Sequence, residues 1–295
     1  MSGPAAAGGR PPLSGRQRWQ IAGFSAAALL IWLGLRFLGG PPPLSPMDFV
    51  AGGADALQFC DPNHPQFLPV VARSSPVSLS YAPGRPSRVI LMTASGKPIG
   101  PDQLAPTDGA RLWLFLVDRN LTQFQARRPV PGAAPGEWVF DDASSGPGPF
   151  RVFADLTPAA TGRELYARAA SDGSEAATQS PPADGVWRIE LHSAPAQTYA
   201  RQLLALTLSI RRADGAPFIL GTTGGARAHL VAFDQGASGL VNLRSVEPAG
   251  MADGHASGEA HFAVTFPDSG AYVLWAELTL NGQTMIRRFA LNVLP

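Results

Sequence analysis

Cysteine is nearly absent from this chain: Cys60 is the only one in 295 residues. A single thiol cannot form an intramolecular disulfide, a Cys-x-x-Cys redox pair, a haem attachment site or a thiolate metal cage. Lipidation of Cys60 is also disfavoured, because the bulky Phe59 precedes it and the apolar N-terminal segment ends well before it. We therefore expect a partly buried, inert thiol.

Clusters of basic residues are absent beyond the N-terminus. Four of the 23 basic residues lie in the first 40 residues, where there is no acid, so the rest of the chain holds 19 basic and 22 acidic residues. A body with a net charge of −3 and no basic stretch lacks the electrostatic footprint of a nucleic-acid-binding protein. We expect no nucleic-acid partner.

Motifs of common catalytic sites are missing as well. The sequence contains no Gly-x-Ser-x-Gly elbow, phosphate-binding loop or dinucleotide-binding fingerprint. Asp141 and Asp142 are adjacent, and adjacent residues of a strand point to opposite faces, so they make a poor acid/base couple. We predict that the protein is not an enzyme and has no catalytic or cofactor-binding residues.

A long apolar run is present near the N-terminus. Residues 19–35 read WQIAGFSAAALLIWLGL without a charge, and the side chain of Arg36 can extend toward the membrane surface. Residues 19–38 are therefore long enough to cross about 30 Å of hydrocarbon as a transmembrane helix. The arginines before this run predict that residues 1–18 form a disordered cytoplasmic tail.

A cleaved signal peptide is the alternative interpretation of this run. Pro41, Pro42 and Pro43 follow it directly, and proline at the junction disfavours cleavage, so we favour a retained signal anchor. Within the helix, Gly23 and Ala27 have the small-xxx-small spacing that permits close helix packing. Ordinary apolar filler explains these small residues equally well.

The remaining chain is divided by changes in composition. Residues 39–56 are rich in Pro and Gly and predict a tether, and residues 172–184 have almost no large apolar side chain and predict a linker. Two domains follow from these boundaries, residues 57–171 and residues 185–295.

The two domains contain an internal repeat. In residues 88–118 and again in residues 207–234, a Gly-x-Pro turn is followed by Gly-Ala-Arg, which opens a strand ending in aspartate. Other segments correspond in the same order: 136–140 with 258–262, and 149–156 with 271–278. The repeat predicts two copies of one fold.

Each copy has the pattern of a β-sandwich. Strands of about five to nine residues, separated by Gly and Pro turns in units of about 110 residues, predict an all-β fold of two tandem immunoglobulin-like sandwiches. The stretch from Asp268 to Tyr272 resembles an immunoglobulin tyrosine corner, which predicts a hydrogen bond from the Tyr272 hydroxyl back to the chain. Residues 66–82 and 184–206 are the candidates for the first strands of the two copies.

Alternation within the strands predicts one buried face in each copy. Residues with this pattern are Phe150, Val152, Ala154 and Leu156 in the first copy, and Tyr272, Leu274, Ala276 and Leu278 in the second. The repeat-equivalent Asp155 and Glu277 lie between them. We expect these two acids to pair with arginines on the next strand, namely Arg163 and Arg287 or Arg288.

The repeat unit resembles exported bacterial YtkA-like and related immunoglobulin-like domains linked to copper or heavy-metal handling. The resemblance is carried by strands such as LWLFLVD and AHLVAFD, each followed by a loop and a second aromatic strand. That family often has a His-x-His-Pro motif after the Asp-ended strand. Here the two histidine positions hold Ala126 and Arg128 in one copy and Asn242 and Arg244 in the other, so the family's metal site looks lost.

Histidines elsewhere leave a second metal site open. We expect His229 and His261 on neighbouring strands of the second copy, with His255 in the preceding loop. These three side chains are candidate ligands for copper or zinc. Strand histidines that only form hydrogen bonds are the commoner case.

Together these features predict a non-enzymatic, single-pass protein of the bacterial inner membrane, with a cytoplasmic N-terminus and periplasmic sandwich domains. We expect it to bind or scaffold a membrane-embedded protein partner as an accessory subunit of a larger complex. Periplasmic copper or heavy-metal handling is the alternative, and a sensor or an assembly chaperone is a third possibility.

Overall fold

The computed structural model describes residues 14–38, 44–49, 68–69, 75–141, 151–169, 185–246 and 258–295. The chain forms two compact units, Met1–Pro43 and Leu44–Pro295. Cys60, His64, Phe150 and the linker predicted at 172–184 lie outside the described residues.

The described residues of the first unit include the helix α1 (Gly15–Leu38). The Ser14 hydroxyl accepts a hydrogen bond from the Gln17 amide at 3.4 Å, and the Gln17 side chain accepts one from the Ser14 amide at 3.1 Å, which caps the helix start. Gly23 and Ala27 are both exposed on α1. In the described part of the chain, no helix is both long enough and apolar enough to span a bilayer. Membrane crossing by residues 19–38 stays a prediction.

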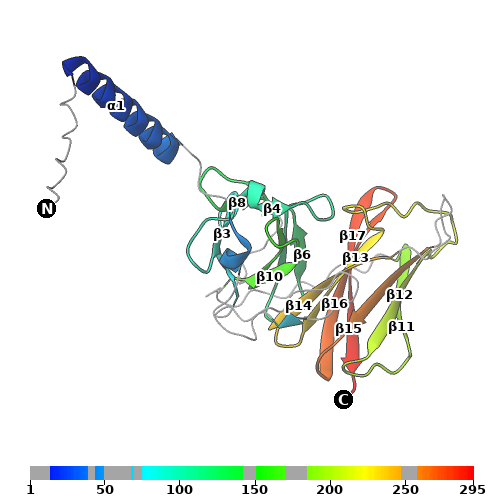
Figure 1. Cartoon of the computed structure of the whole chain (residues 1–295). Helices are drawn as coiled ribbons and strands as arrows, with labels where there is room; N and C mark the ends of the chain where they lie inside the picture. The colour runs from blue at the N-terminus through cyan, green and yellow to red at the C-terminus, as the bar shows by residue number, and fades with distance from the viewer. Residues whose placement is uncertain are drawn as a thin grey trace, which may run out of the picture. The chain divides into compact units, whose positions relative to one another are not determined.

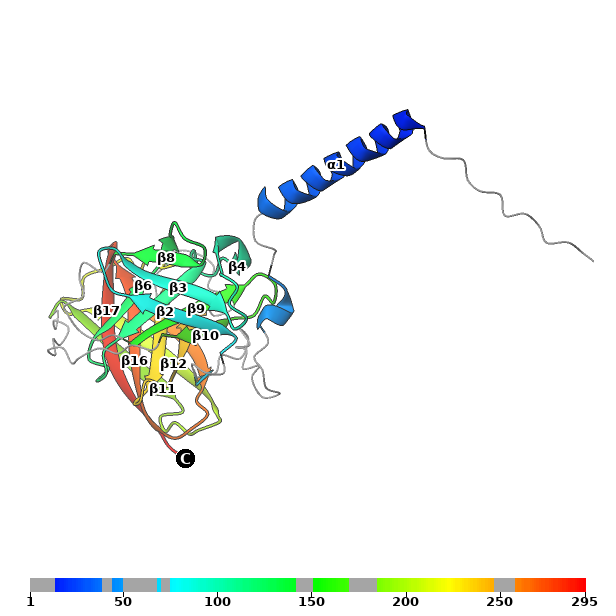
Figure 2. The same ribbon diagram turned by 90° about the vertical axis from the view of Figure 1, so that its left-hand side faces the viewer.

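The first sandwich consists of two antiparallel sheets (Figure 1). One has the order β2 (Val77–Ala82), β3 (Ser87–Thr93), β8 (Glu137–Phe140), β7 (Val130–Pro131). The other has the order β10 (Leu165–Arg168), β9 (Arg151–Pro158), β5 (Leu112–Val117), β6 (Phe124–Arg127), with β4 (Leu104–Ala105) paired to β9 after the short helix η2 (Pro101–Gln103). Figure 2 shows β2, β3 and β8 side by side.

The second sandwich repeats this plan. Its smaller sheet has the order β11 (Trp187–Ala194), β12 (Leu203–Arg212), β15 (Glu259–Thr265). Its larger sheet has the order β14 (Gly239–Arg244), β13 (Ala228–Asp234), β16 (Gly270–Leu280), β17 (Gln283–Val293). The first, second and fifth strands thus share one sheet and the others share the second, an immunoglobulin-like arrangement.

Each sandwich encloses its own apolar core. The first core contains Val152, Ala154 and Leu156, and the second contains Tyr272, Leu274, Ala276 and Leu278. The alternation read from the sequence is therefore confirmed at these positions. The tyrosine corner is confirmed too, because the Tyr272 hydroxyl donates a hydrogen bond to the Asp268 carbonyl oxygen at 3.0 Å.

The internal repeat is visible in matched turn geometry. The Asp118 carboxylate accepts a hydrogen bond from the Thr122 amide at 2.7 Å, and the Asp234 carboxylate accepts one from the Ser238 amide at 2.6 Å. Leu121 and Ala237 occupy the same place in these turns, with φ angles of 54° and 45°. Equivalent strands and equivalent turns confirm two copies of one fold.

Two segments before β2 differ from the sequence prediction. The short helix η1 (Pro46–Phe49) lies within the predicted tether, but Phe49 is fully buried in the first core and Asp48 pairs with Lys97 at 2.6 Å. The strand β1 (Leu68–Pro69) was expected in the first copy, yet it pairs with β14 of the second sandwich. Of the expected segment 66–82, Val77–Ala82 supplies the first strand of the first copy.

Candidate functional site at the interface between the sandwiches

The two sandwiches share a third apolar core, which lies between the β5–β6–β9–β10 sheet and the β13–β14–β16 sheet (Figure 1). We call it the interface core. Its buried members are Trp113, Phe115, Val117, Leu121, Phe124, Phe153, Tyr166, Val231, Phe233, Ala237, Leu240, Val273 and Trp275. Aromatic rings contact each other across it: Phe124 stacks on Trp275 at 5.4 Å, and Phe153 lies tilted at 5.4 Å from Phe233.

This third core explains why β5 is buried at every position. Leu112, Leu114 and Leu116 point into the first sandwich, whereas Trp113 and Phe115 point the other way into the interface core. A strand that is buried on both faces reads as a continuous apolar run instead of an alternating one.

Trp113 and His229 mark a local twofold relation between the copies. Each is paired in register with an acid on the neighbouring strand, Trp113 with Asp155 and His229 with Glu277, so the two residues are equivalent in the repeat. Their rings lie 4.9 Å apart. Contact between equivalent residues is expected where a twofold axis relates their copies, as in a symmetric dimer.

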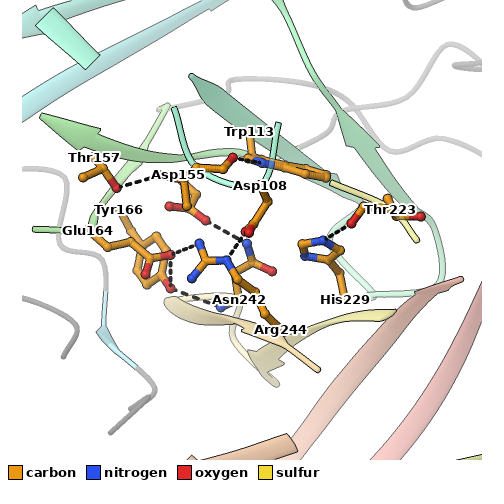
Figure 3. A network of polar contacts seen from close by, with 11 residues as sticks. Asp108, Trp113, Asp155, Thr157, Glu164, Tyr166, Thr223, His229, Asn242 and Arg244 are labelled. Carbon is orange, nitrogen blue, oxygen red and sulfur yellow. Dashed lines mark hydrogen bonds and ion pairs between the residues drawn. The ribbon is translucent and has the colours of Figure 1, made fainter. Parts of the chain in front are cut away.

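A polar network lies on one side of this axis (Figure 3). The Asn242 amide nitrogen donates a hydrogen bond to the Asp155 carboxylate at 2.8 Å, and the Asn242 backbone N–H donates one to the Tyr166 hydroxyl at 3.1 Å. The Tyr166 hydroxyl in turn donates to the Glu164 carboxylate at 3.4 Å. The two hydrogen bonds of Asn242 join one sandwich to the other, whereas the bond from Tyr166 to Glu164 lies within the first sandwich.

Arg244 completes the network. Its guanidinium binds the carboxylates of Asp108 and Glu164, the latter at 3.3 Å. Both acids belong to the first sandwich and Arg244 ends β14 of the second, so the ion pairs also cross the interface. Glu164 and Asp155 are both buried.

Burial shifts the ionisation of these acids. It raises the pKa of Asp155 to about 6, while hydrogen bonds from Asn242 and Glu164 act in the opposite direction. Burial raises the pKa of Glu164 well above its usual value, and the neighbouring Asp155 raises it further. The two carboxyl groups therefore hold a proton into a pH range where ordinary carboxyls are ionised.

The other side of the axis is simpler. Arg128 lies 4.2 Å above the Trp113 ring and 3.7 Å from the Glu277 carboxylate, again from one sandwich to the other. Burial raises the pKa of Glu277, and Arg128 partly offsets that shift. The four positions Arg128, Arg244, Asp155 and Glu277 are thus used for interface pairing in both copies.

His229 is a buried member of the interface. Its Nε2 lies 2.9 Å from the Thr223 carbonyl oxygen, which can only accept, so Nε2 carries the proton and Nδ1 is unprotonated in the neutral ring. Burial lowers the pKa of His229. The ring is therefore neutral and packed against Trp113.

The predicted metal site is not formed by His229 and His261. His229 lies on β13, whose neighbours are β14 and β16, and faces the interface core side of its sheet. His261 lies on β15 in the opposite sheet, paired with β12. The core of the second sandwich separates the two sheets, so the prediction of neighbouring strands was wrong, and His255 lies outside the described residues. Among the described residues, no group of three or more His, Cys, Asp or Glu side chains is gathered as a metal site.

The predicted partners of the two acids were also wrong. Asp155 contacts Asn242, and Glu277 contacts Arg128, in place of arginines on the adjacent strands. Asn242 and Arg244, which the sequence placed at lost metal-ligand positions, belong to the polar network. The continuous apolar run 112–117 was the sequence signal for a second buried face.

Comparisons with known proteins concern the second sandwich and the general fold. A family model matches residues 182–294. It is described as a domain of unknown function (DUF8832). No curated protein matches the chain.

Among solved structures, domains 4 and 5 of the S-layer protein SbsC are 11% identical, with 75% of this chain and 98% of that chain covered and a TM-score of 0.24. A chimeric titin Z1Z2-Z1Z2 tandem is 12% identical, with 78% and 100% covered and a TM-score of 0.18. Chicken CNTN1 FN1-FN3 domains are 10% identical, with 79% and 69% covered and a TM-score of 0.19. Scores this low support no inference about function.

Proposed function

We propose that this chain is a non-enzymatic binding or scaffolding protein whose two sandwiches act as one rigid body. The interface core is the observation that carries this proposal. Domains joined by a small polar contact move relative to each other, whereas a large apolar interface holds them together. Here 13 buried residues, most of them aromatic or branched, form that interface.

The polar network supports the same role. Its buried carboxylates are engaged by Asn242 and Arg244 from the opposite sandwich. A buried polar network whose members bind one another fixes a single relative orientation of the parts that it joins. Packing of the two sandwiches thereby explains why the pKa values of Asp155 and Glu164 are raised.

Rigidity can be measured with two spin labels. In a Cys60→Ser background, cysteines replacing the exposed residues Ser80 and Arg211 place one label on each sandwich. A single narrow distance distribution is expected by pulsed electron paramagnetic resonance. A broad distribution in the unmodified interface would overturn the proposal of one body.

The proposal includes attachment to the bacterial inner membrane by residues 19–38, with the sandwiches in the periplasm. Large apolar side chains of α1 are exposed in the chain alone, Trp19 by 82%, Phe24 by 78% and Leu30 by 69%. An exposed apolar surface of this kind is expected to be covered by lipid or by another protein. We propose that it brings the sandwiches to a membrane-embedded partner as an accessory subunit.

Attachment is tested by extraction of membranes with alkaline carbonate. The full chain should stay in the pellet, and Leu30→Arg should shift it toward the supernatant, because a charge at the centre of a membrane helix costs about 2.5–3.5 kcal/mol. Ser25→Ala is the matched control and should stay in the pellet. Release of the unmodified chain would contradict the anchor.

The partner is tested by purification from membranes in a mild detergent. We expect a membrane-embedded protein to co-purify with the full chain in a fixed ratio. A monodisperse chain without any companion would contradict the role as an accessory subunit, while leaving the rigid-body proposal to the spin-label experiment.

A further inference from the structure

The smaller sheet of the second sandwich has an open face that the interface does not use. On β11, the residues Ile189 and Leu191 pack against the second core, so Glu190 and His192 between and after them lie on the outer face. Their side chains are 56% and 57% exposed. Residues two positions apart on a strand share one face, so Glu190 and His192 lie next to each other. We call such a Glu-x-His pair an arm.

A second Glu-x-His arm lies on β15. Ala260 and Phe262 point into the core, which leaves Glu259 and His261 on the outer face with exposures of 47% and 33%. The spacing of carboxylate and imidazole is the same in both arms. It is 3.7 Å from His192 Nε2 to Glu190 and 3.8 Å from His261 Nε2 to Glu259.

The arms are aligned across the central strand β12. His192 is in register with Thr207, and Thr207 with His261; Glu190 is in register with Ser209, and Ser209 with Glu259. Neighbouring strands lie about 4.8 Å apart, so the two arms are about 10 Å apart between Cα atoms. In the described part of the sheet, the small side chains of Thr207 and Ser209 stand between them.

We propose that this face binds one divalent transition-metal ion, such as Zn²⁺, through Glu190, His192, Glu259 and His261. Metal–nitrogen and metal–oxygen bonds of about 2.0–2.2 Å allow two ligands to stand up to about 4 Å apart, and each arm already meets that limit. Two imidazoles and two carboxylates form a ligand set that suits Zn²⁺ and Cu²⁺ better than Mg²⁺ or Ca²⁺.

In the described structure the two arms are not gathered around one point, so binding requires their side chains to turn toward β12. The His261 Nδ1 lies 3.2 Å from the Thr207 hydroxyl. When Nδ1 donates this hydrogen bond, the His261 Nε2 is unprotonated and can bind a metal. Glu190 and His192 are more than half exposed, so they can turn toward β12 at little packing cost. Arg188 and Arg211 are in register with each other next to the glutamates, on the side away from the histidines. Their positive charges repel a cation, so the ion is expected near the histidines.

The test is titration of the full chain, purified in detergent and stripped with EDTA, with ZnCl₂ in a buffer that does not bind metals. We expect one ion per chain. His192→Ala and His261→Ala should each weaken binding at least about tenfold, because even outer-shell partners of a metal are worth about 10- to 100-fold. Ser209→Ala lies between the arms without being a ligand and should bind as the unmodified chain does.

Two outcomes would overturn the proposal. One is binding that survives the double substitution His192→Ala with His261→Ala, which would place the metal elsewhere. The other is a single-arm variant that keeps its affinity, which would mean independent arms in place of a shared site. Unfolding of each variant in EDTA should match the unmodified chain, which separates loss of the site from loss of the fold.

Discussion

The two sandwiches share one fold but present different side chains to each other. Where the first copy has Ala126, the second has Asn242, and where the first has Trp113, the second has His229. The equivalent arginines also differ: Arg244 binds two carboxylates with its side chain 25% exposed, while the Arg128 side chain is 42% exposed and contacts one.

Residues that face the core of a sandwich and residues that face the other sandwich therefore have different roles. Core-facing residues of the two copies are apolar side chains that maintain each sandwich. Interface-facing residues are complementary instead of identical, with a donor in one copy opposite an acceptor in the other. Complementary surfaces favour the pairing of unlike partners over the pairing of like ones.

The largest effect is expected from the interface core. Trp275→Ala should lower the free energy of unfolding by about 3–5 kcal/mol, because it opens a cavity beside Phe124. Its equivalent in the first copy, Phe153, should give a similar loss on replacement by Ala. Denaturant unfolding followed by circular dichroism measures both.

Trp275→Phe is the matched control for this cavity. It keeps an aromatic ring and removes the indole N–H, which is buried without a protein hydrogen-bond partner in the described structure. The loss should therefore be well below that of Trp275→Ala. Equal losses for Ala and Phe would contradict the packing role.

The equivalent arginines sharpen the comparison between the copies. Arg244→Ala should cost about 3 kcal/mol, because it leaves the buried Glu164 and the partly buried Asp108 without their cation. Arg128→Ala should cost less, about 1 kcal/mol, because the Arg128 side chain is 42% exposed and contacts one carboxylate. Equal losses at the two positions would show that the copies contribute equally to the interface.

The pH dependence of stability should come mainly from the Asp155 side of the interface. A pKa of about 6 in the folded chain, against an ordinary value of 3.8, means that the folded state holds a proton that the unfolded state releases. Stability should therefore fall by about 1–3 kcal/mol as the pH rises from about 4 to about 6, and Glu164 should extend the fall to higher pH.

His229 gives a slope of opposite sign, because its pKa is lowered and its unfolded form takes up the proton first. The measurement is therefore the difference between the unmodified chain and Asp155→Asn across this pH range. That difference should change with pH, and a constant difference would contradict the assignment.

The smallest effect is expected at the tyrosine corner, where the copies also differ in sequence. Tyr272→Phe should lower stability by about 1 kcal/mol, the value of one hydrogen bond. The first copy has Phe150 at this position, outside the described residues. Thermal unfolding of the single variant measures the loss, and no change in the melting temperature would contradict a stabilising role for the bond.

The sequence was sufficient for the fold because strand alternation and repeat spacing are local patterns. Leu274, Ala276 and Leu278 reveal a buried face by their spacing alone. Alternation does not say whether the opposite face is covered by something else. Trp275 lies on that opposite face, and only the apolar run of 112–117 in the first copy hinted that it is buried.

The site was beyond sequence reasoning because its contacts join distant residues. Asp155 and Asn242 are 87 positions apart, and no local pattern indicates that they meet. The prediction for His229 and His261 failed for a related reason. Strands that lie close together in the sequence often belong to different sheets of a sandwich, as β13 and β15 do here.

The shared interface core also has a consequence for biosynthesis. The first sandwich is complete once the ribosome has passed Ala169, but Trp113, Phe115 and Phe153 stay uncovered until Trp275 has been made, about 100 residues later. At about 5–20 residues per second, that interval lasts roughly 5–20 seconds. During each round of synthesis, the nascent chain carries an aromatic patch that a chaperone or the second sandwich must cover.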